Sequence, residues 1–336
     1  MLSREIISLM VMEFSSEAVL EKLSDPYWFQ ALGCVLGFDW HSSGLTTTTC
    51  GAIKEGIRGL ENELGFFACG GKGAASRKTP DQIRVNADKH IVQIDAEKLV
   101  YASKMSAKVD SAAVQDGYNL YHHSFFYNRA GHWTVVQQGM NDSNGWARRY
   151  HWLSTGVDDF VCEPHAAVCS DKLTDVDLNM VAGEAGENRT VSAQIACDKP
   201  EKALAEVQKM RELIMPGRHE ILPVDITPAY LQKVLLTTYE QQPEGFEQLL
   251  GTKGVGGKTI RALAMISDLV YGAPLSKRDP AAYSFAHGGK DGIPYPVDRK
   301  SYDKTTVIIK KAVEKAKLGN NETNDAIRRL GQFYDF

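Results

Sequence analysis

The 336-residue sequence has no apolar run of the roughly 18 residues that a membrane-spanning helix requires. Its best apolar stretch, Ile6–Met12, is short, lies between two glutamates and makes a poor signal peptide, because no basic segment leads it. Repeats of fixed period and low-complexity segments are also absent from the sequence. We therefore expect a soluble, cytoplasmic protein, and at about 150 residues per domain the length predicts two domains.

The sequence also lacks an excess of basic residues and is poor in cysteine. Its 38 Lys+Arg against 42 Asp+Glu give a net charge of -4, so a nucleic acid could be bound only through a local basic patch. Six cysteines without a Cys-x-x-Cys pair exclude the disulfide framework of a small secreted domain and predict reduced thiols. Cys162, His165 and Cys169 could share a metal ion, but a fourth ligand is not evident nearby, which favours buried thiols and a loop histidine.

The first 200 residues mix helix and strand patterns. Aromatic and β-branched residues at 119–127 and 132–139 flank a turn and predict a β-hairpin, which Tyr150–Leu153 and Val161 could extend. Before this hairpin, periodicity and stop signals predict helices at 4–24 and from the threonine cluster 46–49 to Leu64, whereas 27–40 cannot be assigned by period.

From about residue 200 the pattern becomes helical, with almost no strand signal. The predicted helices are 202–214, 228–240, 245–250, 258–271 and 302–318. This change places a domain boundary near 200–225. The sequence therefore predicts an α+β N-terminal domain over residues 1–215, followed by an all-α domain over residues 216–336.

The most informative motif lies in the second of these domains. Residues 249–264 read LLGTKGVGGKTIRALA, which resembles a helix-hairpin-helix, a module shared by many DNA repair proteins; Thr252 and Lys253 depart from it, because an aliphatic residue and proline are usual there. Gly254 and Gly256 permit a tight turn, and the first amides of the next helix have no partner within it, which makes an anion site for a phosphate. A glycine-rich turn without a ligand is the alternative. We predict a helix-hairpin-helix DNA-binding domain that grips DNA independently of base sequence, through Lys253, Gly254, Val255, Gly256, Gly257, Lys258 and Arg261.

The lysine of this motif supports a second hypothesis, a DNA glycosylase or lyase. Base-excision glycosylases with this hairpin carry a similar Gly-Val-Gly-x-Lys-Thr string, whose lysine attacks the sugar C1′, and a downstream Pro-Val-Asp whose aspartate activates it. Pro296–Asp298 is similar, but it lies 40 residues beyond Lys258, a longer spacing than is usual in that superfamily. Asp279 is nearer and lacks the flanking Pro-Val. The resemblance implies catalytic roles for Lys258 and Asp298, against a helix cap as the alternative for Asp298.

Polar side chains concentrate in three parts of the first domain, at 37–44, at 109–117 and in the strands 134–139 and 148–152. A carboxylate at a strand end, with further Asp and His nearby, is what a divalent-metal nuclease requires. For any single residue, a turn or a sheet position is the simpler interpretation. The glycine-rich segment 70–73 is a weaker candidate for a phosphate-binding loop. For the group we predict catalytic roles for Asp39, His41, Asp110, Asp116 and His122, an Mg²⁺ or Mn²⁺ site at Asp39, Asp110 and Asp116, and phosphate contacts from Arg148 and Arg149.

Several long segments together look like one family. Residues 29–34, 108–117, 137–141 and 285–292 resemble the uncharacterised prokaryotic family called "domain of unknown function 763", over nearly the entire chain. This resemblance implies no established reaction. Our leading hypothesis is a DNA-processing protein of repair type, a metal-dependent nuclease that holds the phosphate backbone through the hairpin. The alternatives are the glycosylase and a non-catalytic DNA-binding module whose first domain recruits a partner.

Overall fold

The computed structural model describes residues 2–38, 43–90, 95–170, 176–212, 228–282 and, near the C-terminus, 307, 309–311, 313–314 and 319–334. The described chain mixes helices with antiparallel sheet, as predicted. No helix in these ranges is both long enough and apolar enough to cross a membrane. All six cysteines are free, which agrees with the predicted thiols.

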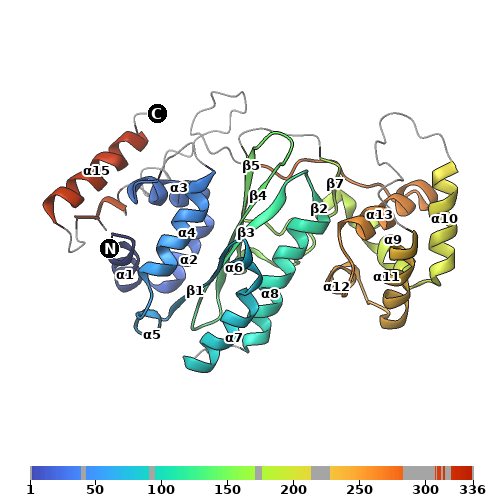
Figure 1. Cartoon of the computed structure of the whole chain (residues 1–336), viewed down its shortest axis with the longest axis horizontal. Helices are drawn as coiled ribbons and strands as arrows, with labels where there is room; N and C mark the ends of the chain where they lie inside the picture. Colours follow the sequence, from blue (N-terminus) through green and yellow to red (C-terminus); the bar gives the residue numbers. More distant parts are fainter. Residues whose placement is uncertain are drawn as a thin grey trace.

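A five-stranded antiparallel sheet with the order β1-β3-β4-β5-β6 forms the centre of the molecule (Figure 1). The predicted hairpin is confirmed as β3 and β4, and β5 extends it, whereas Val161 lies outside the strands. Gly70–Lys72 belong to β1 and pair with β3, so the weaker candidate for a phosphate-binding loop at 70–73 is strand as far as Lys72. The strands of the sheet are β1 (Phe66–Lys72), β3 (Asn119–Asn128), β4 (Trp133–Met140), β5 (Ala147–Leu153) and β6 (Ala167–Ser170), while β2 (Val114–Gln115) and β7 (Leu178–Asn179) pair separately.

Five N-terminal helices lie on one face of the sheet: α1 (Leu2–Glu13), α2 (Ser16–Ser24), α3 (Pro26–Val35), α4 (Gly44–Gly56) and α5 (Glu61–Leu64). The single helix predicted over 4–24 is broken, because Ser15 has a φ of 140° and its Oγ caps α2 at the amide of Ala18. The unassigned apolar run is helix α3, since the Asp25 carboxylate accepts from the amide of Tyr27 at 2.9 Å and Pro26 occupies the first turn. The apolar run before Asp39 is therefore helical and does not form a strand.

The opposite face of the sheet is covered by α6 (Ala74–Arg77), α7 (Thr79–Lys89) and α8 (Ala96–Lys108), the last of which continues into a π-helical turn at Val109–Ala113. Side chains alternate across the sheet as the period of a strand requires. Phe126 and Val136 join the core under the N-terminal helices, whereas Phe125 and Val135 join the core under α8. The sheet thus separates two apolar cores, and neighbouring residues of one strand lie in different environments.

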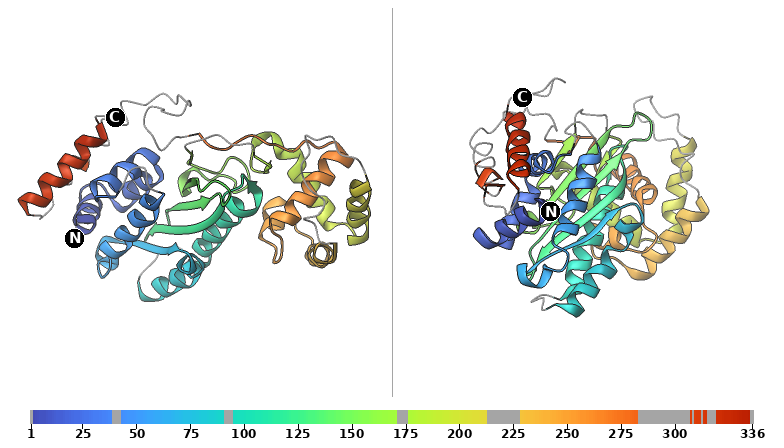
Figure 2. Two further views of the ribbon diagram at one scale, coloured as in Figure 1. Left: turned by 45° about the horizontal axis from the view of Figure 1, so that its top comes forward. Right: turned by 60° about the vertical axis from the view of Figure 1, so that its left-hand side comes forward.

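The later helices α9 (Gly186–Cys197), α10 (Pro200–Glu212), α11 (Pro228–Gln241), α12 (Phe246–Gly251) and α13 (Gly257–Tyr271) gather at the end of the molecule opposite α1–α4 (Figure 2). They share the α8-side core with the sheet, where Ile260 and Leu263 join Phe125. Helix α15 (Asn320–Tyr334) returns to the N-terminal half and packs against α3. The predicted split into an α+β and an all-α domain is not confirmed, because the cores are continuous across it.

Candidate functional site

In the segment 249–264, which resembles a helix-hairpin-helix, residues 252–256 form a turn between α12 and α13. Gly254 has a φ of +91°, a conformation that favours glycine, and Gly256 precedes α13 in extended backbone. The turn lies at the surface, because Lys253, Gly254 and Lys258 are exposed, while the Val255 side chain is fully buried and anchors it. Among the described residues, no side chain caps the first turn of α13.

Two carbonyl groups of this turn, and that of the first residue of α13, accept hydrogen bonds from side chains of the protein. Tyr230 Oη donates to the carbonyl of Gly254 at 2.8 Å, and Gln115 Nε2 donates to that of Gly257 at 2.9 Å. The Nζ of Lys108 donates to the carbonyl of Val255. These carbonyl groups are therefore paired within the protein, whereas the N-cap position of α13, Gly256, supplies no side-chain cap.

Two of the residues predicted to contact DNA, Arg261 and Lys258, differ in their surroundings. Arg261 Nε donates to Gln115 Oε1 at 2.6 Å, and its guanidinium lies 3.2 Å from Asp177, so it is already paired. Lys258 is exposed, whereas an attacking lysine needs burial to lower its pKa. Asp298 lies outside the described residues, and Asp279 is 2.8 Å from Arg148. The described residues thus give no support to the Lys258–Asp298 pair.

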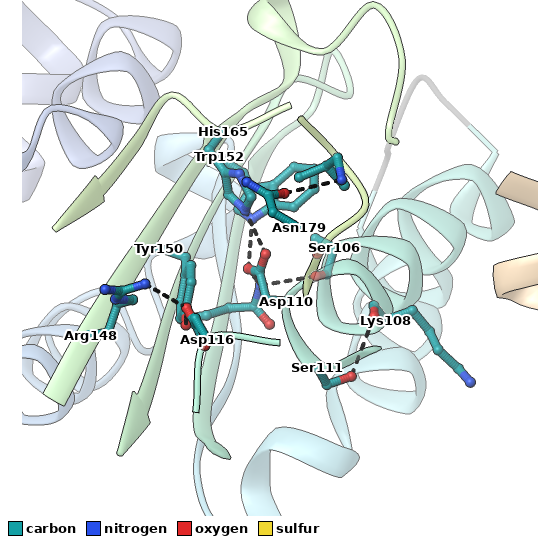
Figure 3. A network of polar contacts seen from close by, with 12 residues as sticks. Ser106, Lys108, Asp110, Ser111, Asp116, Arg148, Tyr150, Trp152, His165 and Asn179 are labelled. Carbon is teal, nitrogen blue, oxygen red and sulfur yellow. Dashed lines mark hydrogen bonds and ion pairs between the residues drawn. The ribbon is translucent and has the colours of Figure 1, made fainter. Parts of the chain in front are cut away.

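In the first half of the chain, Asp110 is the centre of a buried polar network (Figure 3). It lies in the π-helical turn after α8. Its Oδ1 is 2.5 Å from His165 Nε2, and its Oδ2 accepts from Gln137 Nε2 at 2.5 Å and from Trp152 Nε1 at 2.9 Å. Both carboxylate oxygens are therefore occupied by groups of the protein itself.

Asp116 belongs to a neighbouring network on the same face of the sheet (Figure 3). Its Oδ2 accepts from Arg148 at 2.9 Å and from Tyr150 Oη at 2.6 Å, and Arg148 also pairs with Asp279. Burial raises the pKa of Asp116, against the opposing effects of the Arg148 charge and the Tyr150 hydrogen bond. Arg148 has no exposed surface, so the phosphate contact predicted for it would require it to leave these carboxylates.

His122 and Arg149 lie on the face of the sheet that the N-terminal helices cover, opposite the face of Arg148. Side chains alternate along a strand, so His122 shares the face of Phe126, and Arg149 points away from its neighbour Arg148. His122 Nε2 is 3.0 Å from Ser124 Oγ, and burial, with His123 and Lys72 nearby, lowers the pKa of His122 to about 3. Arg149 is buried and donates to His151 Nε2 at 2.8 Å. His122 therefore does not meet Asp110 or Asp116, and Arg149 and Arg148 do not form one phosphate clamp.

Two histidines that were not among the predicted catalytic residues, His165 and His123, take part in the Asp110 network. His165 is 55 positions from Asp110, and no local pattern links them. His123 is connected through Gln137: its Nδ1 is 2.9 Å from Gln137 Oε1, and its Nε2 is 2.9 Å from Ser103 Oγ. Because side chains alternate along β3, His123 faces α8 and its neighbour His122 faces the other way. This alternation could have indicated His123 from the sequence.

The metal hypothesis is only partly covered by the described residues. Within them, no group of three or more His, Cys, Asp or Glu side chains could hold a metal ion. Asp39 and His41 lie in 39–42, outside the described ranges, so their relation to Asp110 and Asp116 is not defined. The Mg²⁺ or Mn²⁺ site therefore stays a prediction.

A family model described as "Protein of unknown function (DUF763)" matches residues 1–297. The chain belongs to this family. The match spans the sheet, both polar networks and the hairpin turn, and it agrees with the resemblance noted in the sequence, whereas it carries no relation to DNA repair proteins. No curated protein and no solved structure matches the chain.

Proposed function

We propose that this protein binds nucleic acid, with DNA as the first substrate class to test, through the phosphate backbone at the turn 252–256 and the start of α13. The observation that carries the proposal is the exposed turn, whose carbonyls at Gly254 and Val255 accept from Tyr230 and Lys108, while the first turn of α13 has no described side-chain cap. The exposed Lys253 and Lys258 flank it and supply local positive charge.

Electrostatics favours a backbone contact over base recognition at this surface. A helix N-terminus attracts anions within its first turn, and two lysines beside it add charge that the overall -4 of the chain does not reveal. Phosphate contacts hold a strand without reading its sequence, and their affinity falls with salt because bound counterions are released. Binding should therefore be sequence-independent and strongly salt-dependent.

The test is fluorescence anisotropy of labelled duplex and single-stranded DNA with the full chain over a salt series. Replacing Lys253 and Lys258 together by Gln should weaken binding on every sequence alike and reduce the salt slope by about 2, about 1 per lost phosphate contact. The matched control replaces Lys89, the last residue of α7, and Lys311 by Gln; both are exposed and far from the turn in the sequence, and the net charge changes equally. Equal affinities and slopes for the two double variants would contradict the proposal.

The reaction hypotheses can be tested on the same labelled DNA. Cutting that requires Mg²⁺ or Mn²⁺ and stops in EDTA would support the predicted nuclease. Abasic sites formed in EDTA, with a borohydride-trapped adduct that Lys258→Gln removes, would support the glycosylase. Binding without either product would leave a non-catalytic DNA-binding module with the hairpin as its contact.

A further inference from the structure

A cavity of about 490 Å³ opens on the α8 side of the sheet, next to the hairpin turn. Gly251, the last residue of α12, lines it, one residue before the turn begins. Lys108 joins the two features, because it lines the cavity and its Nζ also donates to the carbonyl of Val255. A polymer held at the turn would therefore have its neighbouring units beside this cavity.

The outer part of the cavity is positively charged. Arg77 and Lys104 are exposed and Lys108 is half-buried, and all three line it. No Asp or Glu is among the described residues that form its lining. Three cations without a carboxylate between them favour an anionic group at this position, and a phosphate is the anion that the neighbouring turn also suits.

The walls suit a flat, apolar group. Tyr101 and Tyr121 line the cavity together with Met105, Leu120 and Pro80. Bases stack on aromatic side chains with little regard to sequence, which stabilises binding by about 1–3 kcal/mol per base. A cavity of about 490 Å³ also falls in the range of small-ligand sites. Aromatic walls below a basic rim match a base joined to a phosphate.

The inner end offers polar groups whose donor and acceptor roles can be deduced. Gln137 donates through Nε2 to the Asp110 carboxylate, so its Oε1 must accept from His123 Nδ1–H. His123 Nε2 is then free of hydrogen and accepts the hydroxyl proton of Ser103. Ser103 is left with oxygen lone pairs to offer, and it lines the cavity with His123 and Gln137. The amino group of a base could donate a hydrogen bond to this oxygen.

We propose that the cavity is a nucleotide pocket that takes one base, with its phosphate at Arg77, Lys104 and Lys108 and its amino edge toward Ser103. The assignment rests on the proposed function, since the nucleotide is taken to belong to the strand held by the hairpin. The pocket deepens that function by adding a stacking site, which phosphate contacts alone do not supply.

The experiment uses the full chain and three probes: adenosine 5′-monophosphate, adenosine and inorganic phosphate, with dissociation constants from NMR titration. Ala107 lines the cavity half-buried, and Ala107→Trp should fill it and weaken the monophosphate at least about tenfold. The matched control is Ala205→Trp on the exposed side of α10, which should bind as the wild type. Unchanged binding in Ala107→Trp would overturn the pocket.

A charge variant keeps the proposal testable if Ala107→Trp does not fold. Lys104 is exposed at the rim, so Lys104→Gln should weaken the monophosphate by about fivefold and leave adenosine unchanged. Equal effects on both probes, or on neither, would overturn the assignment.

A single-stranded oligonucleotide separates this inference from the proposed function. Loss of affinity in both the Lys253/Lys258 variant and Ala107→Trp supports both. If the lysine variant weakens the oligonucleotide while Ala107→Trp does not, the pocket is overturned and the proposed function stands. If the monophosphate binds at the cavity and no oligonucleotide binds, the proposed function fails and the occupant is a free nucleotide.

Discussion

Mild acid should destabilise this protein through histidines that are buried in the neutral form. His151 is fully buried: its Nδ1–H donates to the carbonyl of Leu23 at 2.9 Å, and its Nε2 accepts from Arg149 at 2.8 Å. Protonation of Nε2 would place an N–H against the guanidinium. Burial, with the Arg149 charge, lowers the pKa of His151 well below its ordinary value, and burial lowers that of His122 to about 3.

The size of the effect follows from proton linkage. In the unfolded chain a histidine has a pKa of about 6.5 and is protonated at pH 5, whereas these two stay neutral in the folded chain. Each then lowers the free energy of unfolding by about 2 kcal/mol at pH 5 relative to pH 8, or about 4 kcal/mol together, against a typical total of about 5–15 kcal/mol. Because both folded-state pKa values are depressed, the loss begins as the pH falls below about 6.5 and, for His122, continues to about 3.

Urea unfolding followed by tryptophan fluorescence at pH 8 and pH 5 measures this loss. Asp116 acts in the opposite direction, since its raised pKa gives stability that is present below 3.8 and is lost as the pH rises. The comparison is therefore between the wild type and a variant: His151→Gln should shrink the pH-dependent loss by about 2 kcal/mol. NMR titration that finds His122 and His151 protonated in the folded protein at pH 5 would refute the reasoning.

Two further substitutions test the sheet in urea unfolding. Arg148→Met should lower the free energy of unfolding by about 3–5 kcal/mol, because it leaves buried carboxylates without their cation. The control is Arg84→Met, which removes only exposed ion pairs and should leave the free energy of unfolding as in the wild type. Similar losses in the two variants would contradict the buried pairing of Arg148. Gly70→Ala should prevent stable folding, because its Cβ would lie 2.1 Å from the carbonyl oxygen of His123 at a φ of +86°. Gly59→Ala has a similar φ of +81° with no atom within 4 Å, and should cost only about 1–2 kcal/mol; equal losses would show that backbone strain, not contact, decides both.

The sequence alone determined the elements that depend on neighbours along the chain. The β3–β4 hairpin follows from alternating aromatic and β-branched residues around a short turn. Gly65, at a φ of +59°, ends α5 where the stop signal predicted, although the single helix predicted from 46–49 to Leu64 is divided into α4 and α5. The hairpin turn before α13 also follows from local residues, because Gly254 supplies a φ of +91° that other residues rarely adopt. These features need no knowledge of the rest of the fold.

Only the tertiary structure decided which polar residues meet. Strand alternation puts His122 and Arg149 on one face of the sheet and Arg148 on the other, although the numbers suggest one cluster. Asp110 meets His165 across 55 positions because β-sheet pairing and the π-helical turn bring both into one core, where a buried carboxylate must find donors. Contacts of this kind depend on burial and on long-range packing, which a local pattern of residue types does not encode.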